Sequence, residues 1–215
     1  MSDCRHLLAT GLLMCSQLGA SAADSESPNT GTFLDRSPSD VRVVTFNVLS
    51  DSIFSRVNAT RAEGFTRLAA AIAPDVWAFQ ELGYGNPSST GSELKSLLDT
   101  IQPIQDGWNV FKSGEFAIAS RWPITRRTGN ISPVGAKPVM AALVDLPDAE
   151  FPVDLYLMNA HYKCCGDTTF DYLRQRDSDA VVSWMRDART PGGNVDLPYA
   201  TPMIVTPPQF LYQCS

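Results

Sequence analysis

Four polar side chains with acid–base or metal-binding chemistry lie at or next to the ends of apolar runs in the sequence. They are Asn47, Glu81, Glu115 and His161. A carboxylate at the end of a buried strand is costly unless a cation or a proton donor meets it, and a hard divalent metal is its natural partner. Histidine exchanges a proton near neutral pH. These residue types indicate metal-assisted acid–base chemistry.

The first two of these residues are brought together by a predicted strand, helix and strand. Residues 41–49 and 76–79 are short runs rich in strand formers. Between them, residues 60–63 (Thr-Arg-Ala-Glu) fit a capping box at a helix start. The expected apolar stripe of this helix is Ala62, Phe65, Leu68, Ala69 and Ile72. Two parallel strands connected in this way place Asn47 and Glu81 at the same edge of one sheet.

Each candidate also has a plainer interpretation. Asn47 can cap the turn at residues 50–51, and His161 can be a histidine at the edge of the core with a satisfied hydrogen bond. Glu115 lies beside an expected hairpin turn, where a carboxylate is usually solvated. For His161 the presence of Glu81 favours the functional interpretation.

The remaining pattern alternates further strands with two helices. A helix is expected at residues 93–101, a hairpin at 108–111 and 116–120, strands at 140–146 and 153–160, a helix at 171–188 and a strand at 201–205. The chain therefore has the composition and pattern of an α/β domain.

Composition and the amino-terminal segment limit the classes of protein to which the chain can belong. The 215 residues carry a net charge of −6 and a pI of about 4.8, which disfavours tight sequence-independent binding to duplex nucleic acid. Arg5, the apolar run at residues 7–18 and the small residues 20–22 have the pattern of a signal peptide. The run is too short to span a bilayer, so we expect a secreted or periplasmic protein without a stable membrane span.

The cysteines do not pair evenly in the exported chain. Removal of residues 1–22 leaves Cys164, Cys165 and Cys214. A vicinal disulfide between the first two, a bond to a distant partner and a free thiol all stay open. At least one free thiol is expected, and Cys214 is the first choice. No CxxC spacing indicates zinc.

Four motifs in order give the sequence a family resemblance. They are FNV at Phe46–Val48, QE at Gln80–Glu81, GEFAIASRWPI at Gly114–Ile124 and NAHYKCCG at Asn159–Gly166. Together they resemble the endonuclease/exonuclease/phosphatase superfamily, whose members include DNase I-like nucleases, sphingomyelinases and inositol phosphatases. The resemblance implies a DNase I-like two-sheet α/β sandwich over residues 41–205, preceded by a linker at 23–40.

The resemblance also implies an activity and a role for each candidate residue. Glu81 takes the position of the metal-binding glutamate, and Asn47 that of an asparagine that helps to hold the metal or the phosphate. His161 takes the position of a histidine that binds or protonates the phosphoryl oxygen, and Glu115 orients it. The implied reaction is Mg²⁺- or Mn²⁺-dependent hydrolysis of a phosphodiester or phosphomonoester. Nucleic acid, phospholipid headgroup and sugar phosphate all stay open as substrates, and no protein partner is implied.

The carboxyl-terminal part departs from the family pattern. Members continue with a GDFN-type and an SDH-type motif, and neither occurs in this sequence, where residues 206–215 form a tail without a pattern. We therefore expect a partial domain whose second half is incomplete. The alternative to an impaired phosphoesterase is a catalytically inactive fragment or a non-catalytic binding remnant.

Overall fold

The computed structural model describes residues 40–85, 87–131, 139–164, 168–193 and 195–206. All of them belong to one compact unit, Ser37–Ser215. The predicted signal peptide, nearly all of the linker, the tail beyond Thr206, Cys165 and Cys214 lie outside the described residues, so the predictions made for them stay predictions. No helix among the described residues is long and apolar enough to cross a membrane.

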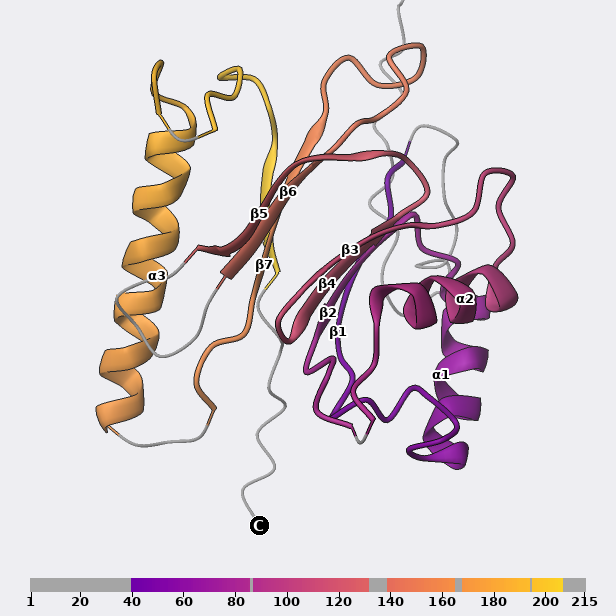
Figure 1. Cartoon of the computed structure of the whole chain (residues 1–215). Coiled ribbons are helices and arrows are strands. Elements are labelled where there is room, and N and C mark those ends of the chain that lie inside the picture. Colours follow the sequence, from indigo (N-terminus) through magenta and orange to yellow (C-terminus); the bar gives the residue numbers. More distant parts are fainter. Residues whose placement is uncertain (1–39, 86, 132–138, 165–167, 194, 207–215) are drawn as a thin grey trace, which may run out of the picture. The chain divides into compact units, whose positions relative to one another are not determined.

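The described residues form two mixed sheets of four strands each. The first sheet has the order β1-β2-β4-β3 and the second β5-β6-β7-β8. The strands are β1 (Val43–Asn47), β2 (Val76–Gln80), β3 (Asn109–Ser113), β4 (Phe116–Ser120), β5 (Ile124–Ile131), β6 (Val139–Val144), β7 (Leu155–Ala160) and β8 (Met203–Thr206), and the helices are α1 (Ala59–Ile72), α2 (Gly91–Ile101) and α3 (Thr168–Ala188). Figure 1 shows α1 and α2 beside the first sheet and α3 beside the second. This is the predicted two-sheet α/β sandwich.

Three apolar clusters hold these layers together. One lies between α1, α2 and the first sheet, one between the two sheets, and one between the second sheet and α3. Strand β2 shows how the alternation works: Trp77 and Phe79 face the helices, whereas Val76 and Ala78 face the second sheet. Because β2 is buried on both faces, it reads as a continuous apolar run in the sequence.

The N-cap of helix α1 lies two residues before the predicted cap. Asn58 is the N-cap, and its side-chain oxygen accepts a hydrogen bond from the backbone N–H of Arg61 at 3.0 Å. The prediction that Thr60 caps the helix was therefore wrong, because Asn58 satisfies a free N–H of the first turn from outside the helix. Leu68 was expected in the apolar stripe, but it is 40% exposed.

Strand β5 was not predicted. Its sequence from Ile124 to Ile131 carries two arginines, a glycine and an asparagine, and its pairing with β6 shifts register twice. An edge strand with irregular pairing does not show clean alternation, which explains why sequence periodicity missed it.

A buried pair of amides links the two sheets. Gln80 ends β2 and Asn159 lies in β7, and both are fully buried. Nε2 of Gln80 donates to Oδ1 of Asn159 at 2.6 Å, and Nδ2 of Asn159 reaches the carbonyl oxygens of Phe79 at 2.8 Å and Ala117 at 3.1 Å. Buried polar groups are stable only when they are paired, so this pair fixes how the two sheets meet.

We expect Asn159→Ala to lower the free energy of unfolding by about 2 to 4 kcal/mol, because it leaves buried amide and carbonyl groups without partners. Urea denaturation measures this change. Gln175→Ala is the control, since it removes an exposed amide that only bonds Asp179 one helical turn away, and it should change stability by less than about 0.5 kcal/mol. Equal stability of the two variants would contradict a structural role for the amide pair.

Candidate active site

The predicted site residues meet where three strands end. Asn47 is the last residue of β1 and lies opposite Gln80 in the parallel register, so Glu81 follows at the same sheet edge. His161 follows the last residue of β7. Nε2 of His161 lies 3.6 Å from Oε1 of Glu81. Residues 80 positions apart in the sequence therefore face one another across the junction of the two sheets.

Glu81 is held in an unusual backbone conformation. Its φ angle is +62°, in the left-handed region that residues with a side chain seldom adopt. Its carboxylate accepts hydrogen bonds from Nδ2 of Asn47 at 2.9 Å and from the backbone N–H of Ser50 at 3.2 Å. Such conformations persist only where surrounding contacts hold them, and they concentrate at functional sites.

Asn47 positions this carboxylate and also caps a turn. Its side-chain oxygen accepts the backbone N–H of Leu49 at 2.9 Å. Because a backbone N–H needs an acceptor, the oxygen faces Leu49 and the amide nitrogen faces Glu81. The turn-capping interpretation of Asn47 is therefore confirmed, and the same side chain also positions Glu81.

Three consecutive residues with positive φ form the loop after β1. The angles are +47° at Leu49, +54° at Ser50 and +63° at Asp51. Two hydrogen bonds fix this loop to the segment after β2: the one from Ser50 to Glu81, and one from the backbone N–H of Asp51 to the carbonyl oxygen of Glu81 at 3.3 Å. The loop is thereby locked against Glu81.

Asp51 anchors the segment that follows Glu81. Its fully buried carboxylate accepts the backbone N–H groups of Gly83 at 2.7 Å, Gly85 at 2.8 Å and Ser89 at 3.2 Å, and the hydroxyl of Ser89 at 2.7 Å. Burial alone would raise the pKa of Asp51, but these hydrogen bonds outweigh burial and lower the pKa below its ordinary value of 3.8. A Cβ added to Gly85 would lie 2.7 Å from Oδ2 of Asp51, so the close approach requires glycine there.

Glu115 orients the imidazole of His161. Nδ1 of His161 lies 3.0 Å from Oε2 of Glu115. An ionised carboxylate only accepts, so Nδ1 carries a proton in this pair and Nε2 is the atom that faces Glu81. The side chains of His161 and Glu115 are 7% and 10% exposed, which excludes the interpretation of Glu115 as a solvated surface residue.

Tyr84 contacts the same carboxylate of Glu115 that bonds His161. Its hydroxyl donates to the same Oε2 of Glu115 at 2.8 Å, although the residue is 56% exposed. Burial of its hydroxyl, the hydrogen bond to Glu115 and the charges of Glu115 and Glu81 raise the pKa of Tyr84 to about 12. Tyr84 is therefore a neutral donor at physiological pH.

A pocket of about 240 Å³ opens between these residues and is lined by Ser50, Glu81, Tyr84 and His161. Within the described ranges, no three His, Cys, Asp or Glu side chains gather in a protein cage for a metal ion. Mg²⁺ does not need a cage, because it keeps several waters and takes one or two carboxylates. The carboxylate of Glu81 lines the pocket and fits that requirement. Metal binding by Asn47 stays a prediction, since its amide nitrogen is the group that faces Glu81.

Sequence patterns indicated four of the site residues and missed three. The structure brings Asn47, Glu81, Glu115 and His161 together as expected. Ser50, Asp51 and Tyr84 were not singled out, because their roles depend on loop conformations. The signals that could have found them are the polar run Ser50-Asp51-Ser52 shortly after β1 and the glycine- and serine-rich segment 83–91 after β2.

No family model matches the chain, and no curated protein matches it in sequence. Solved structures do match. An endonuclease/exonuclease/phosphatase family protein from Bacteroides thetaiotaomicron has a TM-score of 0.52 and 16% identity over 78% of this chain and 62% of that chain. A Beutenbergia cavernae endonuclease/exonuclease/phosphatase scores 0.49 at 17% identity over 70% of this chain and 45% of that chain. TDP2 from D. rerio, complexed with single strand DNA product, has a TM-score of 0.49 and 18% identity over 69% of this chain and 55% of that chain.

The match to the Bacteroides thetaiotaomicron structure establishes the fold. The described two-sheet α/β sandwich is shared with that endonuclease/exonuclease/phosphatase family protein, as the sequence motifs predicted. The chain spans between 45% and 62% of the length of the three matched structures.

The buried carboxylate of Asp51 gives a prediction about acid stability. Because its pKa is lowered in the folded state, Asp51 stabilises the fold above pH 3.8, and this contribution is lost as the pH falls through the lowered value. Asp51→Asn cannot accept all of these hydrogen bonds, so we expect it to lower the free energy of unfolding by about 2 to 4 kcal/mol at pH 7.

The difference between wild type and Asp51→Asn should shrink as the pH falls below 3.8. Chemical denaturation at several pH values measures it. The exposed Asp148 offers a matched control, Asp148→Asn, which should follow the wild type throughout. A variant as stable as the wild type at pH 7 would show that the loop does not depend on this carboxylate.

Proposed function

We propose that the chain is an exported, Mg²⁺-dependent phosphoesterase. The observation that carries the proposal is the placement of Glu81, His161 and Tyr84 on one pocket, with Glu115 hydrogen-bonded to the imidazole and to Tyr84. Phosphoryl hydrolysis builds up negative charge on the phosphate oxygens. A carboxylate that holds a cation and an oriented imidazole can stabilise this charge from opposite sides.

Each residue of the site has a proposed task. In the reaction, the oxygen of a water forms a bond to phosphorus while the bond from phosphorus to the ester oxygen breaks, and the leaving alcohol takes up a proton. In its doubly protonated form, His161 donates Nε2–H to a phosphoryl oxygen, while Glu115 accepts the hydrogen bond from Nδ1–H and holds the ring in place. Tyr84 contributes a neutral hydroxyl at the rim of the pocket.

Glu81 would hold the metal ion, with Asn47 and the backbone N–H of Ser50 fixing its carboxylate. A bound Mg²⁺ would neutralise charge on the phosphate oxygens. The strained conformation of Glu81 supports this assignment, because the surrounding hydrogen bonds keep the carboxylate at the pocket against its backbone preference.

The substrate is proposed only as a phosphate ester. Phosphodiester and phosphomonoester, and nucleic acid, phospholipid headgroup and sugar phosphate, stay alternatives. The net charge of −6 argues against tight binding of a long polyanion. Export, to the periplasm or the medium, rests on the pattern of residues 1–22.

A catalytically inactive or non-catalytic binding form is the alternative. The sequence lacks the GDFN- and SDH-type motifs, and His161 is the one imidazole in the part of the chain that the structure describes. In one step, a single imidazole can either accept a proton from the attacking water or donate to the phosphoryl oxygen, but it cannot do both. We therefore expect slow turnover even if the site is competent.

Hydrolysis of bis-p-nitrophenyl phosphate by the purified chain tests the activity. We expect slow release of p-nitrophenol that requires Mg²⁺ and stops with EDTA. Glu81→Gln and His161→Gln should each lower the rate by about 10² to 10⁴. The exposed Glu63 of α1 provides the control Glu63→Gln, which should keep the wild-type rate.

The outcomes separate the two candidate functions. Wild-type rates in both site variants would show that hydrolysis does not use this site. A chain that melts cooperatively but shows no metal-dependent hydrolysis would favour the inactive form.

Metal binding is a separate prediction. Calorimetric titration with Mn²⁺ should show weak binding to the wild type and none to Glu81→Ala, because Glu81 is the carboxylate that lines the pocket. Glu63→Ala should bind as the wild type does. Equal affinity of Glu81→Ala and the wild type would contradict the assigned metal position.

A further inference from the structure

A second, larger pocket lies directly beside the candidate site. Its volume is about 410 Å³, within the usual range for small-molecule pockets. It lies between the carboxyl end of β1 and helix α1, and its apolar lining consists of Phe46, Val48, Leu49, Ile53, Phe65 and Leu68. Two of these side chains are unusually open for their type, since Leu49 is 51% exposed and Leu68 is 40% exposed.

Gly64 keeps this pocket open. It lies inside α1, where glycine lowers helix stability by about 0.5 to 1 kcal/mol relative to alanine. No positive φ requires it, and a Cβ added there would meet no atom within 4 Å. Packing and backbone conformation therefore do not explain the glycine. Because Gly64 lines the pocket, the absence of a side chain at this position leaves more space in the pocket.

The two pockets share one wall. Leu49 lines the apolar pocket, and the next residue, Ser50, lines the candidate site. Asn47 lines the apolar pocket, while its amide nitrogen donates to Glu81 in the candidate site. The loop of positive φ residues is thus the partition between a polar pocket and an apolar one.

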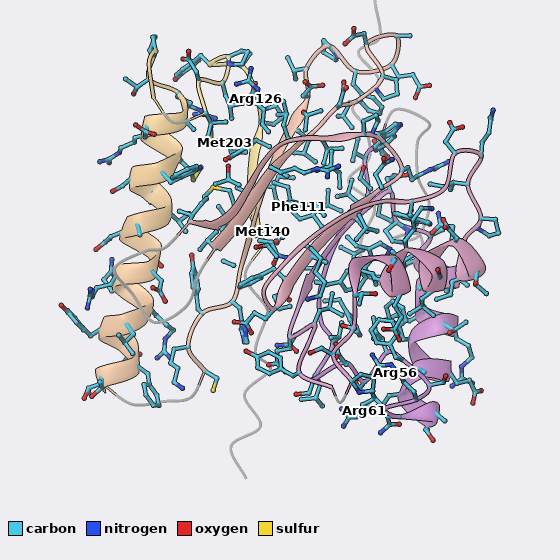
Figure 2. The ribbon with its side chains drawn as sticks, viewed as in Figure 1. Arg56, Arg61, Phe111, Arg126, Met140 and Met203 are labelled. Atoms are coloured by element: carbon cyan, nitrogen blue, oxygen red, sulfur yellow. The ribbon has the colours of Figure 1, made fainter. Side chains whose placement is uncertain are left out.

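The charge at the apolar pocket is positive. Arg61 is the one charged residue that lines it, and Figure 2 labels Arg61 at one end of α1. A guanidinium at the rim favours a ligand that carries an anionic group next to its apolar part.

We propose that this pocket binds the apolar alcohol group of a phosphate ester whose phosphate lies at Glu81 and His161, and that Gly64 keeps it accessible. The inference rests on the proposed function, because the phosphate side of the ligand is assigned to the candidate site. It narrows the substrate class from phosphate esters in general to esters of an apolar alcohol. The two pockets share no lining residue, so such a ligand lies across the loop that divides them. The choice of occupant follows from their adjacency, since Leu49 and Ser50 line the two sides of that loop.

A series of p-nitrophenyl alkyl phosphates with methyl, butyl and hexyl groups tests the proposal. Each methylene that enters an apolar pocket should raise kcat/KM by about fourfold until the pocket is filled. Gly64→Leu fills the pocket, so its kcat/KM should not rise with chain length, while the methyl ester is hydrolysed at the wild-type rate. Thermal melting of Gly64→Leu should be equal to or above that of the wild type, because the helix gains a better helix former.

The control is Ala70→Leu, which adds a leucine to an exposed position of α1 that does not line the pocket. It should keep the dependence on chain length. Wild-type kcat/KM that is independent of chain length, or a dependence that survives in Gly64→Leu, would overturn the proposal.

Direct binding separates this inference from the proposed function. If the chain hydrolyses no ester, calorimetric titration with hexyl phosphate and with inorganic phosphate still tests the pocket. Tighter binding of hexyl phosphate to the wild type, lost in Gly64→Leu and kept in Ala70→Leu, supports the apolar pocket although the catalytic proposal fails. Equal affinity for the two ligands, or equal binding by all three proteins, overturns the pocket as well.

Discussion

The hydrogen bond between Gln80 and Asn159 is the constraint on which the geometry of the candidate site depends. Each amide lies one or two residues before a functional side chain, Glu81 after β2 and His161 after β7. Because both amides are fully buried, sliding of one sheet past the other would leave polar groups unpaired in the core. The link that joins the sheets therefore also sets the distance between the carboxylate and the imidazole.

Beyond the strands, the site is organised by loops that hold strained backbone in place. Glu81 and the residues from Leu49 to Asp51 all have positive φ, and each such residue has an energetic cost of about 1 to 3 kcal/mol. The hydrogen bonds to the carboxylates of Glu81 and Asp51 offset that cost. Two acidic residues that each follow a strand of the first sheet thus take different roles. Glu81 lines a pocket, whereas the carboxylate of Asp51 accepts several backbone N–H groups.

In helix α1, a residue that lowers helix stability likewise leaves space for a pocket. The buried residues of α1 pack on the first sheet, yet Gly64 beside them lowers helix propensity, and a Cβ added there would meet no atom within 4 Å. The helix therefore serves as scaffold on one side and as pocket wall on the other. A residue whose helix propensity is too low for its position inside a helix is expected at a functional site, because stability alone would favour a better helix former there.

The sequence by itself determined the α/β class, most element positions and four residues that the structure brings together at the candidate site. Buried strands appear as apolar runs, and polar residues at their ends stand out against them. The sequence did not determine the irregular edge strand β5, the Asn58 cap of α1, or the roles of Ser50, Asp51 and Tyr84. Those depend on long-range contacts, such as the one between Tyr84 and Glu115. Periodicity is local, whereas the left-handed loop that divides the two pockets exists only once the sheet edges have been brought together.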